Sequence, residues 1–374
     1  MPSVIRPRRH LLDRHLAAVK EWFPHELVPW SRGRDFEPGE AWDPDEVHLD
    51  PAVRSSLFVN LLTEDNLPYY IRTIAALFGQ DTAWGNWARR WTAEEGRHSI
   101  VIRDYLHVTR SIDPWALERA RMQQVEKGEV PVVDTVVDGI VYVTLQELAT
   151  RIAHHNTGKL MDDKAGYEVM KRVAADENRH HLFYRDLGTA ALAIDPSAMV
   201  IAMERQVREF EMPGTGIPDF ETHAHAIARA GIYDFAVHHD DVLVPVIVRQ
   251  WDVEHLEGLN PEAEEARTRL LTRMARIARA GRRFAATRDQ YVQVVTVAHE
   301  MSAADSDPRH VVISTPRPDR AARGLDLVVC QTNRAAADRL LEGRVPRHKY
   351  INFLELQIRL PFYLFHPKIL AKFP

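Results

Sequence analysis

The spacing of apolar residues between residues 51 and 290 predicts a succession of helices. Apolar side chains recur at intervals of three and four positions, and prolines and glycines lie mostly between such segments. No run in this region alternates apolar and polar residues as a half-buried strand would. We therefore expect an all-α region whose helices span residues 52–78, 82–107, 115–127, 134–158, 162–190, 196–209, 219–230, 237–251 and 261–290.

The two ends of the chain have a different character. Residues 1–50 are rich in proline, tryptophan and charge and predict an N-terminal lead-in with one short helix at 10–21. Residues 291–374 carry β-branched runs and prolines, and an alternating apolar pattern at 354–360 is typical of a strand. This C-terminal extension is either partly stranded, a partner-binding or membrane-touching tail, or a poorly ordered appendage. The expected organisation is a lead-in, a helical domain at 51–290 and an extension of unknown structure.

Composition and charge narrow the class of protein. The 374 residues carry a formal net charge of −5, so no overall basic field indicates nucleic acid as a partner. The single cysteine, Cys330, excludes a disulfide framework and fits a reducing compartment. The N-terminus lacks the apolar segment of a secretory signal, and no apolar run approaches the roughly 20 residues of a transmembrane helix. We expect a cytoplasmic protein without a transmembrane segment.

Two Glu-x-x-His motifs lie within the predicted helices, at Glu95/His98 and Glu177/His180. This spacing places a carboxylate and an imidazole almost one turn apart on the same helix face, where both can bind one metal ion. About one or two such motifs are expected by chance in a chain of this composition, so their number alone does not identify a site. A single glutamate in a helix is more often exposed to solvent, and a single buried histidine more often has a structural role.

The context of the two motifs is a repeat. Glu64 precedes the first motif glutamate by 31 residues, and Glu147 precedes the second by 30 residues. An offset of about 30 residues fits two antiparallel helices joined by a short loop. Each half of the repeat can therefore direct two carboxylates and one imidazole toward the same level of a bundle.

These acidic side chains lie on the sides that their helices should bury. A buried carboxylate without a partner is costly, so four of them require charge-balancing groups. Two imidazoles do not suffice, whereas two divalent cations would balance four negative charges. Mixed carboxylate and imidazole ligation favours iron or manganese over zinc, and the arrangement is that of ferritin-like di-metal bundles. The six candidate metal ligands are Glu64, Glu95, His98, Glu147, Glu177 and His180.

Four stretches around these residues resemble the soluble acyl-[acyl-carrier-protein] desaturases, and most of all their actinobacterial branch. They are "LLTEDNLPYY", "RRWTAEEGRHSIVIRDYL", "VTLQELATRIAHHNTGK" and "AADENRHHLFYRDL", and the similarity extends over roughly residues 20–290. The resemblance implies an all-α, ferritin-like di-iron helical bundle with additional helices. It also implies that the six candidates hold two Fe²⁺ ions per subunit, with Glu95 and Glu147 as the carboxylates that bridge the ions or shift during turnover.

The same resemblance implies roles for three further residues. Thr150 matches a threonine near the oxygen-binding side, where a hydroxyl can relay protons. Trp91 and Asp176 match positions that orient ligands and help electrons to enter. Gly96 departs from the family, which usually has asparagine there. Glycine in a helix interior also costs roughly 1 kcal/mol relative to alanine, so this departure could loosen the site without removing a ligand.

The implied function is that of an O2-dependent oxidoreductase of fatty acid biosynthesis, which introduces a cis double bond into an acyl chain bound to acyl carrier protein. The resemblance further implies a homodimer that receives electrons from reduced ferredoxin or a similar donor. Acyl carrier proteins are acidic, so a local basic surface should bind them. The residues that form such a surface, or merely a solvated basic tail, are Arg6, Arg8, Arg9, Arg14 and Lys20.

Two other functions use the same scaffold. A ferritin-like storage protein would bind iron without catalysis, but such chains are usually much shorter and lack the long helices after residue 196. Another di-iron oxygenase, a hydroxylase or N-oxygenase acting on a small molecule, would share the whole ligand set. A long tunnel with a surface for a carrier protein favours the desaturase, and a compact pocket favours the oxygenase.

Overall fold

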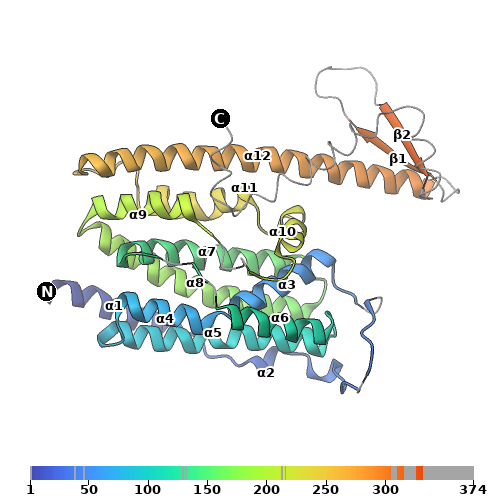
Figure 1. Cartoon of the computed structure of the whole chain (residues 1–374), viewed down its shortest axis with the longest axis horizontal. Coiled ribbons are helices and arrows are strands. Elements are labelled where there is room, and N and C mark those ends of the chain that lie inside the picture. The colour runs from blue at the N-terminus through green and yellow to red at the C-terminus, as the bar shows by residue number, and fades with distance from the viewer. Residues whose placement is uncertain are drawn as a thin grey trace. The chain divides into compact units, whose positions relative to one another are not determined.

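A computed structural model gives the structure of the chain (Figure 1). It describes residues 2–304, apart from 38, 45–46, 129, 132, 212–213 and 215, together with the segments 310–315 and 326–331. Side chains are described between residues 10 and 288, with the same gaps. The contacts divide the chain into a first unit that reaches Ala278 and a second unit that begins at Arg279. All six candidate ligands belong to the first unit.

The described part of the first unit contains helices and no strands, which confirms the all-α prediction. None of the described helices combines the length and the apolar character that crossing a membrane requires. The elements are α1 (Pro2–Ala18), α2 (Pro24–Leu27), the 3-10 turn η1 (Trp30–Arg32), α3 (Pro51–Glu64), α4 (Leu67–Phe78), α5 (Thr82–Val108), α6 (Pro114–Lys127), α7 (Val136–Lys159), α8 (Lys164–Leu192), α9 (Pro196–Glu209), α10 (Phe220–Arg229), α11 (Phe235–Val237), the π-helix η3 (His238–Gln250) and the first part of α12 (Pro261–Ala304).

Asp-Pro pairs define the starts of three helices. Asp50, Asp113 and Asp195 each precede a proline in the first turn, and each aspartate side chain accepts hydrogen bonds from backbone N–H groups of that turn. Proline is favourable there because a first-turn N–H has no partner within the helix. The starts of α3, α6 and α9 are therefore determined by local sequence.

The prediction of one continuous helix at 52–78 is wrong, because a short turn at 65–66 divides the segment into α3 and α4. Pro68 explains the break. Proline has no N–H for a continuing helix and its ring clashes with the preceding turn, so Pro68 is accommodated in the first turn of a new helix. The break makes Glu64 the last residue of α3.

The segment predicted as a helix at 237–251 is helical, but its main part is the π-helix η3. At its end the hydrogen bond from the Trp251 N–H to the Val246 carbonyl oxygen (2.9 Å) spans five residues instead of four. Pro245 lies inside this helix and has no N–H to donate. Apolar spacing therefore predicts that the segment is helical without distinguishing the type of helix.

Four neighbouring helices, α3, α5, α7 and α8, surround the candidate ligands (Figure 1). α7 packs along α8, and α5 packs against both α3 and α8. Trp87 on α5 stacks on Phe183 of α8, with ring centroids 3.6 Å apart, and donates a 3.0 Å hydrogen bond to the Tyr184 hydroxyl. These buried rings fix the relative position of the two helices that carry the Glu-x-x-His motifs.

Helix α1 begins and ends earlier than the short helix predicted at 10–21. Its Leu11 and Leu12 are buried in an apolar cluster with side chains of α4, α5 and α8. Arg14 forms an ion pair with Asp186 of α8. The end of α1 is therefore packed onto the bundle. Among the other basic candidates, Lys20 is exposed, and the described side chains do not include Arg6, Arg8 and Arg9.

The second unit contains the end of α12 and an antiparallel pair of strands, β1 (His310–Thr315) and β2 (Asp326–Gln331). Val312 lies opposite Val329 in this pair. Both strands coincide with β-branched runs of the sequence, "VVIST" and "LVVC". The alternating pattern at 354–360 lies outside the described residues, so a strand there stays a prediction.

Candidate metal centre

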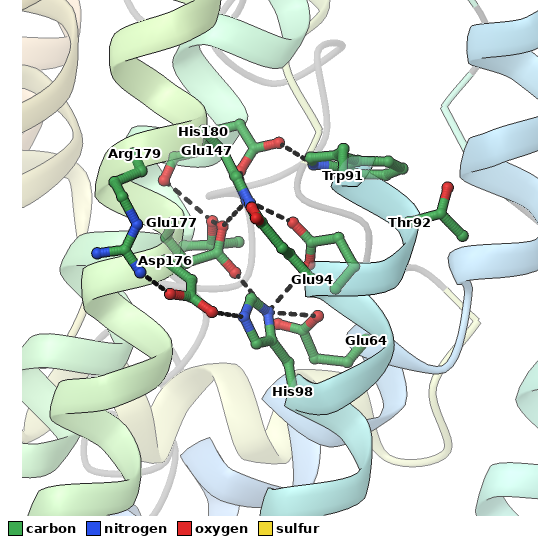
Figure 2. Close-up of polar contacts among 12 residues, drawn as sticks. Glu64, Trp91, Thr92, Glu94, His98, Glu147, Asp176, Glu177, Arg179 and His180 are labelled. Atoms are coloured by element: carbon green, nitrogen blue, oxygen red, sulfur yellow. Dashed lines mark hydrogen bonds and ion pairs between the residues drawn. The ribbon is translucent and has the colours of Figure 1, made fainter. Parts of the chain in front are cut away.

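The six candidate ligands converge inside the bundle, and all of them are buried (Figure 2). They come from four helices, since α3 and α7 each contribute one glutamate and α5 and α8 each contribute one Glu-x-x-His motif. Two sets of four side chains bring their ligand atoms within 4.8 Å of one another. The first set is Glu64, Glu95, His98 and Glu177, and the second is Glu95, Glu147, Glu177 and His180.

Glu95 and Glu177 belong to both sets and lie between the two imidazoles. His98 Nδ1 is 3.0 Å from Glu95 Oε2 and 3.2 Å from Glu177 Oε1, whereas His180 Nδ1 is 2.7 Å from Glu95 Oε1. Glu147 belongs to one set only. The geometry therefore favours Glu95 and Glu177 for the shared positions, where the resemblance implied Glu95 and Glu147.

Each imidazole turns its Nε2 atom toward an acidic residue of the opposite helix. His98 Nε2 on α5 is 3.5 Å from Asp176 Oδ2 on α8, and His180 Nε2 on α8 is 2.9 Å from Glu94 Oε2 on α5. Such acidic partners fix the orientation and tautomer of a metal-binding histidine. Glu94 was missed in the sequence, although the repeat contained a signal: "EEGRH" and "DENRH" both have an acid directly before the motif glutamate.

Asp176 is fully buried and is held by several donors. Its Oδ2 accepts hydrogen bonds from Trp22 Nε1 (2.8 Å) and Arg97 Nη2 (2.9 Å). Its Oδ1 accepts a hydrogen bond from Arg179, which Figure 2 shows. The two guanidinium groups compensate the charge of a carboxylate that would otherwise be costly to bury. The structure thus places Asp176, which the resemblance had implied, directly behind His98.

Trp91 and Thr150 each donate a hydrogen bond to a candidate ligand. Trp91 Nε1 lies 3.0 Å from Glu147 Oε1, and Thr150 Oγ1 lies 3.3 Å from Glu177 Oε2. His154, one turn beyond Thr150 on α7, places its Nε2 atom 3.1 Å from Glu64 Oε1. Its position on the same apolar stripe as Glu147 was visible in the sequence, but no motif distinguished it from a core histidine.

Burial and mutual proximity shift the ionisation of this cluster. Burial disfavours the charged form of every member, yet the neighbouring carboxylates, above all Glu95, raise the pKa of His98 and His180 well above the ordinary value. Burial and the nearby Glu177 raise the pKa of Glu147 well above its ordinary value. Four carboxylates thus share a site with the two imidazoles of the motifs and with that of His154 beside Glu64, which is an arrangement that a bound cation would stabilise.

Several donor atoms of the cluster fit a metal ion. His98 Nδ1, His180 Nδ1 and Glu147 Oε2 are buried and have no hydrogen-bond partner among the described residues. Buried polar atoms are rarely left without a partner, so their joint orientation toward the shared carboxylates points to a ligand. Carboxylate oxygens and imidazole nitrogens suit iron and manganese. The cluster could therefore hold two metal ions.

Two cavities reach the cluster. One is lined by apolar residues of α4 and α7 together with Glu64, Glu147, Thr150 and Glu177. The other is lined by residues of α3, α7 and α10 and the loops beside α10. Thr63, Glu64 and Thr150 line both cavities. An elongated apolar ligand can thus reach the cluster from two directions.

Gly96 lies on α5 between the two residues of the first motif, and a Cβ atom there would meet only Leu67 Cδ2, at 3.9 Å. We expect Gly96→Ala to raise the free energy of unfolding by about 0.5–1 kcal/mol, because alanine loses less conformational entropy in a helix. Chemical denaturation measures this change, and metal content should stay at the wild-type value. A destabilised variant would contradict the free space seen around Gly96.

The fold and this site together define a ferritin-like helical bundle with a buried carboxylate–histidine centre. A family model described as fatty acid desaturase matches residues 6–300. The chain belongs to this family, and the protein is therefore an oxidoreductase.

Known relatives agree with this assignment. A protein of Mycobacterium tuberculosis named as acyl-[acyl-carrier-protein] desaturase DesA1 is 42% identical over 269 residues, which cover 69% of this chain and 79% of that protein. The stearoyl-[acyl-carrier-protein] 9-desaturase 6 of Arabidopsis thaliana is 30% identical over 287 residues, with 66% and 72% of the two chains covered. The X-ray structure of DesA2 from M. tuberculosis superimposes with a TM-score of 0.56 at 24% identity, over 71% of this chain and 99% of that chain, and supports the fold.

Proposed function

We propose that this protein is an acyl-[acyl-carrier-protein] desaturase whose six buried ligands hold two iron ions. The observation that carries the proposal is the pair of overlapping ligand sets, which share Glu95 and Glu177 and contain one histidine each. Two ions held in this way would have related ligands and two common carboxylates. The names of the relatives, which specify acyl-[acyl-carrier-protein] substrates, support the choice of substrate.

The reaction is the removal of two hydrogen atoms from adjacent methylene groups, which leaves a cis double bond. Two further electrons from a reduced donor and two protons convert O2 into two molecules of water. Bound iron would supply the O2 chemistry that amino-acid side chains cannot provide, since acid–base groups do not activate an alkyl C–H bond. The residues of the chain have to bind the substrate, exclude water and hold the ligands.

The side chains around the centre suit these tasks. The Thr150 hydroxyl lies where both cavities meet the cluster and donates to Glu177, so it can hold or pass a proton beside the substrate. Trp91 orients Glu147, and Asp176 orients His98. An acyl chain that entered through the cavity beside α10 and continued into the cavity between α4 and α7 would place a middle segment against Glu64 and Thr150.

The remaining parts of the proposal concern partners and location. We infer that acyl carrier protein delivers the substrate, that reduced ferredoxin or a similar protein donates electrons, and that the protein acts as a homodimer in the cytoplasm. The two cavities share Thr63, Glu64 and Thr150 in their linings, and together they would hold a long acyl chain better than the compact substrate of a hydroxylase or N-oxygenase. A storage function would leave these apolar cavities without a role.

An activity assay tests the proposal. The protein, loaded with iron, is incubated with reduced ferredoxin, O2 and acyl-[acyl-carrier-protein] substrates of several chain lengths. We expect an acyl product lighter by two hydrogen atoms, with the double bond located by mass spectrometry after derivatisation. A product heavier by one oxygen atom would identify a hydroxylase instead. Iron binding without any acyl product would support a storage function.

A further inference from the structure

His15, near the end of α1, reaches the metal centre through Glu94. His15 Nε2 lies 2.9 Å from Glu94 Oε2, and the same oxygen lies 2.9 Å from His180 Nε2. All three side chains are buried. The imidazole of His15 is therefore linked to a candidate metal ligand by two consecutive hydrogen bonds that share one carboxylate oxygen.

The surroundings of His15 hold it in this position. Its ring stands perpendicular to that of Trp87, with centroids 4.8 Å apart, and Leu11 and Leu12 anchor the preceding turn of α1 in the core. His15 Nδ1 has no hydrogen-bond partner among the described residues. The tautomer with its proton on Nε2 is favoured, because only that nitrogen has an acceptor. His15 thus donates to Glu94.

Few other hydrogen bonds fix the position of the Glu94 carboxylate. Its Oε1 accepts a hydrogen bond from Arg90, one turn earlier on α5, whose side chain is partly exposed. Within the described part of the chain, Oε2 has the imidazoles of His15 and His180 as its hydrogen-bond partners. Without His15, the carboxylate would keep one hydrogen bond to the partly exposed Arg90 and one to the ring of His180, which it has to orient. Its rotamer would then be poorly defined.

The other half of the centre is built differently. Asp176, which faces His98, is fixed by Trp22, Arg97 and Arg179 and needs no contact from α1. The two candidate metal positions therefore have related ligands and unequal support. Among the side chains that the structure describes, a hydrogen bond from α1 supports the position that contains His180, and none supports the position that contains His98.

We propose that His15 is a positioning residue for the metal position that contains His180, acting by fixing the carboxylate of Glu94. This inference rests on the proposed ligand set. Loss of an outer partner of a metal-binding histidine typically lowers metal affinity by about 10- to 100-fold. His15 contacts Glu94 and not the metal-binding histidine itself. We therefore expect its loss to weaken metal affinity by about tenfold, at one of the two metal positions.

Three variants separate positioning from simple packing. His15→Leu removes the donor and keeps an apolar side chain in the core. His15→Gln places an amide N–H group at a similar reach and should restore the hydrogen bond. His10→Leu changes an exposed histidine of the same helix and serves as the matched control.

Anaerobic titration with Fe²⁺, followed by calorimetry, measures the two binding steps. The step that is lost in His180→Ala identifies the position under study. We expect His15→Leu to weaken that step by about tenfold and to leave the other unchanged, and His15→Gln and His10→Leu to stay within about twofold of the wild type. His15→Leu should have no further effect on iron binding in the His180→Ala background.

Other outcomes would overturn the inference. Wild-type affinities in His15→Leu would exclude a positioning role, and equal weakening of both steps with a lower melting temperature would indicate packing alone. A third equivalent of Fe²⁺, lost in His15→Leu, would show that His15, Glu94 and His180 form a metal site of their own. Fewer than two equivalents in the wild-type protein would refute the ligand set itself, which is a separate failure.

Discussion

Glu177→Ala is expected to bind almost no iron and to lose desaturation by at least about 10³-fold. Glu177 belongs to both ligand sets, so its removal affects both metal positions at once. Its Oε1 atom lies 3.2 Å from His98 Nδ1, and its Oε2 atom accepts the hydrogen bond from Thr150. Alanine at this position leaves three carboxylates and two imidazoles, with Glu95 as the single carboxylate common to both sets. Elemental analysis measures iron, and mass spectrometry of the acyl product measures activity.

Two further variants test whether the loss of iron is specific to a carboxylate shared by both ligand sets. Glu168→Ala removes a partly exposed glutamate of the same helix, which forms an ion pair with Lys171, and should keep the wild-type iron content. Glu147→Ala removes a ligand of one set only and should retain about one of the two ions. Full iron content in Glu177→Ala would refute the ligand assignment. Equal loss in Glu147→Ala and Glu177→Ala would contradict the difference between shared and unshared carboxylates.

The fold could be predicted from the sequence because its signals are local and periodic. Apolar residues at intervals of three and four indicate helices, and Asp-Pro pairs mark where three of them begin. The break at Pro68 and the π-helical hydrogen bonds of η3 were not predicted. Apolar periodicity indicates which residues of a segment face the core, and it carries no information about the backbone hydrogen bonds.

The convergence of the six candidate ligands could be predicted because the repeat constrains their positions twice. Glu-x-x-His places its two side chains on one helix face, and the matching offsets to Glu64 and Glu147 bring the two halves to one level of the bundle. His15 could not be found in this way. Its contact with Glu94 joins residues that are 79 positions apart, and it depends on how α1 packs onto α5.

The acidic residues that contact the Nε2 atoms of His98 and His180 could be predicted only in part. Asp176 was implied by resemblance, while its counterpart Glu94 was missed although it occupies the same place in the repeat. A glutamate beside another glutamate in a helix normally points to a different face, because successive residues are about 100° apart. Glu94 therefore appears on the helix surface when one helix is considered alone. It is buried because α1 and α8 cover that side of α5.

A substitution at Gly139, which lines the cavity between α4 and α7, is expected to change the length of the acyl chain that the enzyme accepts. This glycine is buried in the first turn of α7 and lines the cavity together with Leu77 and Phe78. A Cβ atom at this position would lie 3.2 Å from Leu77 Cδ1 and 3.2 Å from Phe78 Cζ, so little space is available at the backbone itself. Gly139 precedes Glu147 by eight residues, or about 12 Å along the helix, and thus lies away from the metal ligands.

We expect Gly139→Leu to shorten the acyl chains that the enzyme accepts while iron content stays at the wild-type value. The new side chain would occupy space that otherwise holds the end of the substrate. Excluding three or four buried methylene groups costs about 3 kcal/mol, which corresponds to a loss of roughly 100-fold in kcat/KM for the longest substrates. Shorter substrates that do not reach Gly139 should react at nearly the wild-type rate.

A panel of acyl-[acyl-carrier-protein] substrates of increasing length measures this change. Val136→Leu is the matched control, because it adds bulk to the same turn of α7 at an exposed position and should leave the chain-length profile unchanged. If Gly139→Leu lowered kcat/KM equally for every chain length, the end of the chain would not lie beside Gly139. A selective loss of long substrates would instead identify the cavity between α4 and α7 as the site of the methyl end, and would therefore orient the chain across the centre with its carrier on the side of α10.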